Sequence, residues 1–76
     1  MTISKRILSM IVEEIQPRDP QTVDSSIEEW DSLDRVEFLM YLEEEFSIII
    51  QDEEAEYWKT VSDIIKTVSE LRDVQL

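Results

Sequence analysis

Hydrophobic residues recur at helical spacing in the first part of the chain. Isoleucines repeat every four residues and neighbouring apolar residues widen the stripe, which consists of Ile3, Ile7, Leu8, Ile11, Val12 and Ile15. This spacing places the side chains on one face of an α-helix. Thr2 is a candidate N-cap, and Pro17 and Pro20 end the pattern. We therefore expect an amphipathic helix, followed by a loop from Gln16 to Glu29 that Val23 and Ile27 anchor to the core.

The segment from Leu33 to Phe46 has no Gly or Pro and carries apolar residues on two sides of a helix. Phe38, Leu39, Leu42 and Phe46 fall on one side, and Leu33, Val36 and Met40 fall on the other, interleaved with Glu37 and Glu44. Asp31 is a good N-cap candidate, and Asp34 places negative charge at the positive end of the helix dipole. In so short a chain, one face should be core. The other should be an apolar strip for a partner, with Ser32 at its head.

The last third of the chain predicts a connection and two helices. Ser47-Ile48-Ile49-Ile50 has no partner strand elsewhere, so we expect an extended connection with Ile50 buried. The stretch from Asp52 to Trp58 predicts a short acidic helix in which Ala55 and Trp58 face inward. Thr60 should cap a last helix, with Asp63 completing a box-like start. The core stripe of that helix is Val61, Ile64, Ile65, Val68 and Leu71. Three main helices and one short helix predict an all-α, up-and-down bundle formed as a single domain, 1–76.

Composition removes several classes of function. The 76 residues suit one domain, and no apolar run approaches the ~20 residues that span a bilayer. No signal-peptide pattern opens the chain and there is no Cys, so we expect a cytoplasmic protein, with nothing asking for more than a monomer. The absence of His excludes a Ser–His hydrolase site and a His-based metal site within this chain, and the absence of Gly excludes a Gly-rich phosphate loop. We expect no enzyme activity.

Charge is strongly asymmetric along the chain. The net charge is −12, and residues 28–56 hold twelve acids and one base, Arg35, so that stretch alone carries −11. Nucleic acid and anionic membranes are poor partners for such a surface, whereas a basic patch on another protein is a good one.

The order of motifs resembles the acyl carrier protein family from about Trp30 to Val68. The matching motifs are Asp31-Ser32-Leu33-Asp34, Val36-Glu37, Leu42-Glu43-Glu44-Glu45-Phe46, Asp52-Glu53-Glu54-Ala55-Glu56 and Thr60-Val61. The resemblance implies that Ser32 carries 4'-phosphopantetheine, attached by a transferase that uses coenzyme A and magnesium. An acyl group is then held as a thioester and presented to loading and synthase enzymes. Trp30 before Asp-Ser-Leu resembles carriers of specialised pathways, including some for polyketides, more than carriers of fatty acid synthesis.

The resemblance also implies which residues contact partner proteins and which residues line a cleft for the acyl chain. Basic patches of partners would meet an apolar strip and its acids, with contacts from Asp31, Leu33, Asp34, Val36, Glu37, Met40, Glu43, Glu44 and Glu56. An acyl chain would fold back into a cleft lined by Phe38, Leu42, Ile50, Ala55 and Trp58. Phe38 and Trp58 are larger than the aliphatic residues usual in the family. We therefore expect a shallow cleft and a cargo that is short, polar or left exposed.

These residues allow four other interpretations. Ser32 could be an ordinary helix-start serine, since Ser is common there. The clustered carboxylates lack the alternation and the Gly of a calcium loop, and they lack the pocket that acid–base catalysis needs. An acidic inhibitor or immunity-type protein that plugs a basic enzyme cleft would use the same acidic face. Such a protein would have no use for Ser32, so attachment of phosphopantetheine separates the two functions.

Overall fold

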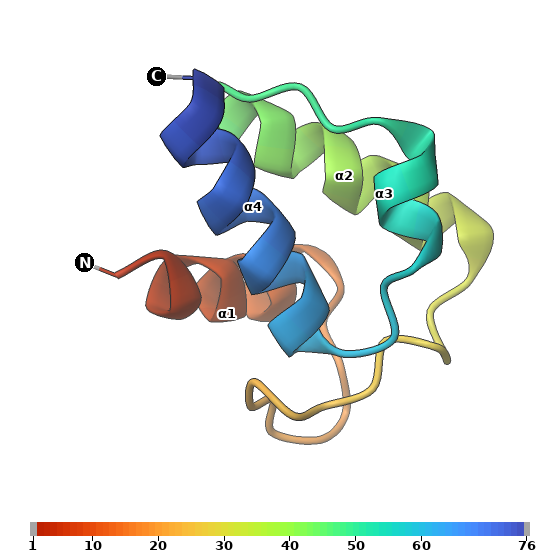
Figure 1. Ribbon diagram of the computed structural model, residues 1–76. Helices are drawn as coiled ribbons and strands as arrows, with labels where there is room; N and C mark the ends of the chain where they lie inside the picture. Colours follow the sequence, from red (N-terminus) through yellow and green to blue (C-terminus); the bar gives the residue numbers. More distant parts are fainter. Residues whose placement is uncertain (1, 76) are drawn as a thin grey trace.

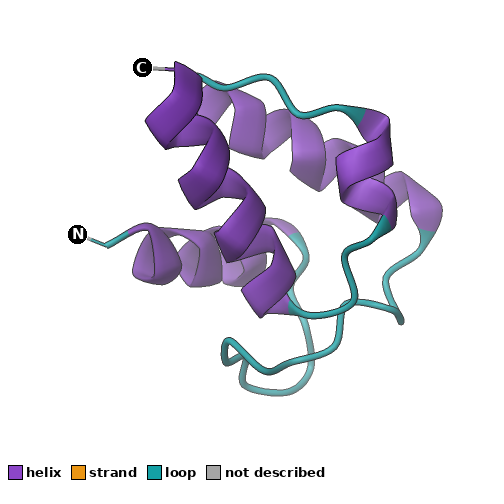
Figure 2. Cartoon of the chain, in the orientation of Figure 1, coloured by secondary structure: helices purple, strands orange, loops and turns teal. Residues whose placement is uncertain are grey.

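The computed structural model describes residues 2–75 and contains four helices. They are α1 (Ile3–Glu14), α2 (Ser32–Phe46), α3 (Asp52–Glu56) and α4 (Val61–Gln75) (Figure 1). Figure 2 shows that the segments joining them are loops and that the described residues form no strand. The three longer helices pack around one core, and α3 lies on the side of the molecule opposite the two termini. The predicted all-α architecture is confirmed.

Helix α1 begins where its cap predicts and buries a slightly different face. The Thr2 hydroxyl accepts a hydrogen bond from the Lys5 backbone N–H at 3.2 Å. Ile7 and Ile11 are fully buried, together with Met10, which the predicted stripe omitted. Val12 is 58% exposed, because five residues beyond Ile7 the helix has turned its side chain away from the core. The prediction that Val12 widens the apolar stripe was therefore wrong.

Both ends of α2 are fixed by local hydrogen bonds. The Asp31 carboxylate accepts from the Asp34 backbone N–H at 2.8 Å, which confirms Asp31 as the N-cap. At the other end Ser47 adopts the left-handed conformation, with φ 54°, and the Ser47 and Ile48 N–H groups bond to the Glu43 carbonyl. Glycine usually takes this position at a helix end, and this chain has none.

The long loop between α1 and α2 is held to the α3–α4 connection by its backbone. The Ile27 N–H donates to the Lys59 carbonyl at 2.9 Å, and the Val61 and Ser62 N–H groups donate to the Ser25 and Val23 carbonyls at 2.9 and 2.8 Å. Ile27 is fully buried, as predicted. Val23 is 40% exposed, so its carbonyl anchors the loop and the prediction that its side chain does so was wrong.

The connection from α2 to α3 is extended, with alternate residues turned inward. Ile48 and Ile50 are buried, whereas Ile49 is 65% exposed. The Ile50 N–H donates to the Glu43 carboxylate at 2.9 Å, which fixes the connection to α2. The following helix ends at Glu56, two residues before the predicted limit at Trp58, and Trp58 nevertheless packs inward.

Helix α4 supplies the face that closes the core. The Asp63 carboxylate accepts from the Lys59 and Thr60 backbone N–H groups at 2.8 and 3.0 Å, which is the returning half of the predicted box. The buried core residues of the molecule are Ile7, Met10, Ile11, Ile27, Phe38, Leu42, Ile48, Ile50, Trp58, Val61, Ile64 and Val68. Within residues 2–75, every helix is too short or too polar to pass through a bilayer.

Candidate functional site

Ser32 is the first residue of α2 and lies at the surface. The Asp31 cap fixes the backbone immediately before it, so the position of the hydroxyl is set by the helix start and not by a mobile loop. No His exists in the chain to act as a base, and the described residues form no cluster of metal ligands. Ser32 is thus an accessible hydroxyl on a rigid element, suited to being modified by another protein.

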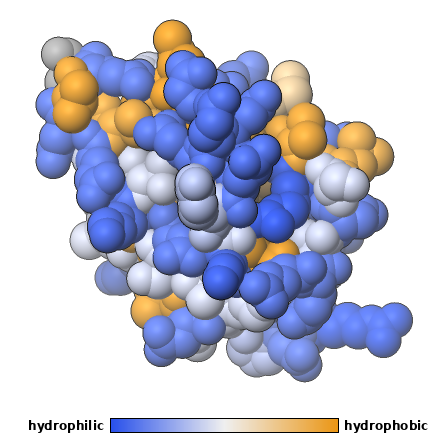
Figure 3. All heavy atoms as spheres, turned by 45° about the vertical axis from the view of Figure 1, so that its right-hand side comes forward, coloured by the Kyte–Doolittle hydropathy of each residue, from blue (hydrophilic) through white to orange (hydrophobic). Residues whose placement is uncertain are grey.

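The outer face of α2 carries the predicted apolar strip. Leu33, Val36 and Met40 are 65%, 57% and 58% exposed, while Phe38 and Leu42 on the opposite side are 1% and 0% exposed. The two-faced character of the helix is therefore confirmed. Figure 3 shows separate hydrophobic patches among mostly hydrophilic side chains on the face turned toward the reader. Exposed apolar residues grouped on one helix face are a common feature of interaction surfaces.

The acids predicted to meet partners do not all have the same surroundings. Glu37, Glu44 and Glu56 are exposed. Glu43 is half-buried and its carboxylate accepts from the Ile50 N–H, so it also holds the connection after α2 in place. Asp31 is exposed and Asp34 is half-buried; the two are joined by the cap hydrogen bond at the start of the helix. Their role in partner binding stays a prediction.

A groove of about 390 Å³ runs beside Ser32, between α2 and α3. It is open to solvent and mostly apolar, and its lining residues are Ser32, Arg35, Val36, Leu39, Asp52, Ala55, Glu56 and Trp58. Its volume lies near the lower end of the range of about 300–1,000 Å³ that is usual for small-molecule sites. An apolar chain attached near Ser32 would find the groove within immediate reach.

Trp58 forms the inner wall of this groove and is held firmly. It is 4% exposed, and its indole Nε1–H donates to Thr67 Oγ1 on α4 at 2.9 Å. The Trp58 carbonyl accepts from the Arg35 guanidinium at 2.6 Å. These contacts reach the residue from both α4 and α2, so it cannot move without breaking at least one of them.

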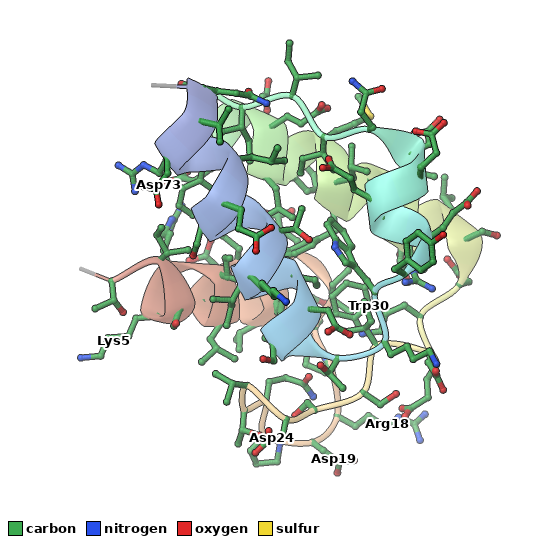
Figure 4. The ribbon with its side chains drawn as sticks, in the orientation of Figure 1. Lys5, Arg18, Asp19, Asp24, Trp30 and Asp73 are labelled. Carbon is green, nitrogen blue, oxygen red and sulfur yellow. The ribbon has the colours of Figure 1, made fainter. Side chains whose placement is uncertain are left out.

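The five residues predicted to line an acyl pocket divide into two groups. Ala55 and Trp58 line the groove. Phe38, Leu42 and Ile50 are at most 5% exposed and belong to the core. The ring of Phe38 also meets Trp30 edge-on, with 5.3 Å between ring centroids and 78° between planes. Figure 4 shows Trp30 near the middle of the molecule, while the labelled charged residues lie at its periphery. Whether these five residues meet an acyl chain stays a prediction.

Sequence reasoning missed three residues that line the groove, namely Arg35, Leu39 and Asp52. Arg35 carried a signal that could have found it. It lies three residues after Ser32, which places it on the same side of the helix one turn later, and it is the one base in residues 28–56.

The geometry at Ser32 fits attachment of an arm through a phosphodiester. The hydroxyl is exposed, and the start of a fifteen-residue helix is the end at which added negative charge is favourable. The groove provides space on one side of Ser32, and the other side of the residue faces solvent.

Comparison with known proteins gives a consistent result. The family model described as a phosphopantetheine attachment site matches residues 5–68. Acyl carrier proteins of Chlamydia trachomatis serovars L2 and D are each 36% identical over 74 residues, covering 92% of this chain and 96% of theirs. A mitochondrial acyl carrier protein of Toxoplasma superposes with a TM-score of 0.82 at 31% identity, covering 92% of this chain and 87% of that one. An acyl carrier protein of Thermotoga maritima, at 23% identity, shares the fold with a TM-score of 0.79, covering 95% and 88%.

Proposed function

We propose, since this chain belongs to the acyl carrier protein family, that it holds acyl intermediates on an arm attached to Ser32 and presents them to biosynthetic enzymes. The cofactor of the family is covalently attached 4'-phosphopantetheine, and its members are carriers without catalytic activity of their own. The family works together with a phosphopantetheinyl transferase and with biosynthetic enzymes. The residues that do this in the present chain, and the cargo, are the subject of the proposal.

The observation that carries the proposal is the position of Ser32. It is an exposed hydroxyl at the first residue of α2, within the matched residues 5–68 and beside the groove. The Ser32 oxygen would bond to the phosphorus of the phosphopantetheine half of coenzyme A, and 3',5'-ADP would leave. The transferase would take the hydroxyl proton, because this chain has no His base. When bound, the arm supplies a thiol that holds an acyl group as a thioester.

The outer face of α2 is proposed to be the surface that partners recognise. Leu33, Val36 and Met40 supply apolar contact area. The surrounding acids Glu37, Glu44 and Glu56 would meet Arg or Lys of a partner, which mainly speeds and orients association. That residues 1–76 form one carrier domain, that it is a monomer, and that it works in the cytoplasm stay predictions.

The test is the intact mass of the protein after incubation with coenzyme A, magnesium and a competent phosphopantetheinyl transferase. We expect the wild type to gain the mass of one phosphopantetheine group and Ser32→Ala to gain none. Ser26→Ala is the matched control, since Ser26 is also exposed but lies in the α1–α2 loop, and it should gain mass like the wild type. A wild type that stays unmodified would contradict the proposal and leave the inhibitor function as the better account.

A further inference from the structure

We propose that Arg35 determines how long an acyl chain the groove beside Ser32 admits. The inference rests on the proposed function, because it needs a chain attached near Ser32. It concerns a residue for which neither the family match nor the sequence motifs supply a role. Arg35 is a positioning residue in this account: it acts by holding the inner wall of the groove in place.

The first observation is the contact that Arg35 makes across the groove. Its side chain starts on α2, one turn after Ser32, and its guanidinium donates to the Trp58 carbonyl at 2.6 Å. Trp58 lies just beyond α3, so this hydrogen bond joins the two sides between which the groove runs. A hydrogen bond with an ionised donor is stronger than one between neutral groups, and this one is partly shielded from solvent.

The second observation is that the contact is not an ion pair. Asp52 and Glu56 line the same groove, yet within residues 2–75 the salt bridge that forms is Arg6–Glu45, at 3.0 Å, and none involves Arg35. The one base in the acidic stretch 28–56 is thus directed at a neutral carbonyl between two helices. A guanidinium that served only to balance charge would lie against a carboxylate.

The third observation is how Trp58 is held. Its N–H donates to the Ala55 carbonyl at 3.1 Å, its indole N–H to Thr67 at 2.9 Å, and its carbonyl accepts from Arg35. Behind it lies the filled core, including Phe38 at 1% exposure. A chain longer than the open groove would have to displace Trp58 and release Arg35 together. The cargo that fits without this change is an aliphatic acyl group no longer than the open, mostly apolar groove.

The experiment compares acyl chains of increasing length on several variants. A transferase attaches acyl-phosphopantetheine from butyryl, octanoyl or dodecanoyl coenzyme A, and intact mass confirms loading. The melting temperature of each loaded protein is then compared with that of the same variant carrying the unacylated arm.

Arg35→Met keeps most of the side-chain length and removes the donor. Arg35→Lys keeps a donor. Arg18→Met is the matched control, because Arg18 is exposed in the α1–α2 loop at the periphery of the molecule (Figure 4).

In wild type, Arg35→Lys and Arg18→Met, we expect the melting temperature to level off once the chain is longer than the open groove, so that dodecanoyl adds nothing over octanoyl. In Arg35→Met it should continue to rise, by about 5 °C by dodecanoyl, because the released wall lets the longer chain become buried. Should Arg35→Met fold poorly, Arg35→Leu, which also lacks a donor, provides the same comparison. Equal dependence on chain length in wild type and the Met or Leu variant would overturn the inference. The intact mass recorded before the melting experiment shows separately whether an arm has been attached to Ser32. If no mass is gained, the proposed function is overturned, and this inference falls with it.

Discussion

Two residues hold backbone conformations that glycine would take at lower cost. Gln16 and Ser47 have φ values of 55° and 54°, in the left-handed region, in a chain with no glycine. An L-residue pays roughly 1–2 kcal/mol there because its Cβ crowds the following carbonyl oxygen. Ser47 ends α2 and directs the chain into the connection that contains buried Ile48 and Ile50.

We therefore predict that Ser47→Gly stabilises the protein by about 0.5–1 kcal/mol, which is the relief of strain less the added freedom of the unfolded chain. The measurement is the free energy of unfolding from urea titration. Ser69→Gly is the control, since Ser69 lies inside α4 and glycine there should destabilise by about 0.5–1 kcal/mol. If both substitutions destabilise, the left-handed conformation of Ser47 is not the source of strain.

Asp63 is one acid whose environment makes stability depend on pH. Hydrogen bonds from the Lys59 and Thr60 backbone N–H groups favour its charged form and lower the pKa of Asp63 below the ordinary value of 3.8. A lowered pKa in the folded state means that the stabilisation is complete above the ordinary pKa and is lost as the pH falls through the lowered one.

Replacing Asp63 by Asn should accordingly destabilise the protein at pH 7, by about 1 kcal/mol as for other helix-start contacts. The difference from wild type should shrink as the pH is taken below the ordinary pKa of Asp63. Chemical denaturation of both proteins across the acid range measures it. Asp73→Asn, at an exposed position near the end of α4, is the control, and a constant difference for Asp63→Asn at every pH would contradict the account.

At the scale of elements, helix α2 combines two functions in one segment. Its inner face is core, and its outer face leaves Leu33, Val36 and Met40 in solvent. An exposed apolar strip gives nothing to the stability of the isolated molecule, which is why we predict that it binds partners. The acids around it would favour partners with a basic surface.

Met40→Ala should weaken binding of a partner enzyme by about 1–2 kcal/mol if Met40 is a central anchor. Val74→Ala is the matched control, because Val74 is 81% exposed on α4 and outside the strip, and it should leave affinity unchanged. Binding should also weaken and association slow as salt rises. The affinity for the partner is measured by titration calorimetry. If it is unchanged by Met40→Ala, by Glu37→Lys and by added salt, this face is not the docking surface.

The helices were predictable because their signals are local. Isoleucine spacing, the Asp31 cap and the stripe from Val61 to Leu71 each act within one segment, and each appears in the structure. The side chains of Val12 and Val23 were predicted to face the core but are exposed. Apolar character alone does not determine the direction of a side chain at the edge of a helical stripe or in a loop. The groove could not be derived in the same way. Its walls come from α2 and from the segment around α3, and the Arg35–Trp58 contact joins residues 23 positions apart.

At the scale of the whole molecule, the net negative charge is concentrated in one part of the chain. The acidic stretch 28–56 contains α2 and α3, which flank Ser32 and the groove. Two bases lie at the opposite end of α2 from Ser32, where Arg6 pairs with Glu45 at 3.0 Å and Arg72 lies 5.8 Å from the centre of the Phe46 ring. The hydrogen bond from the Arg6 guanidinium to the Glu45 carboxylate lowers the pKa of Glu45 and raises the pKa of Arg6. A basic partner would therefore be steered toward the side that bears Ser32.

The central claim is that Ser32 bears an arm whose thiol holds the cargo. It is tested most directly by loading the protein with butyryl-coenzyme A and a transferase, then recording intact mass before and after neutral hydroxylamine, which cleaves thioesters. We predict that the wild type loses the butyryl mass and keeps the phosphopantetheine mass, with fragmentation placing the arm on Ser32. A butyryl group that survives hydroxylamine, or an arm found on another residue, would contradict the account.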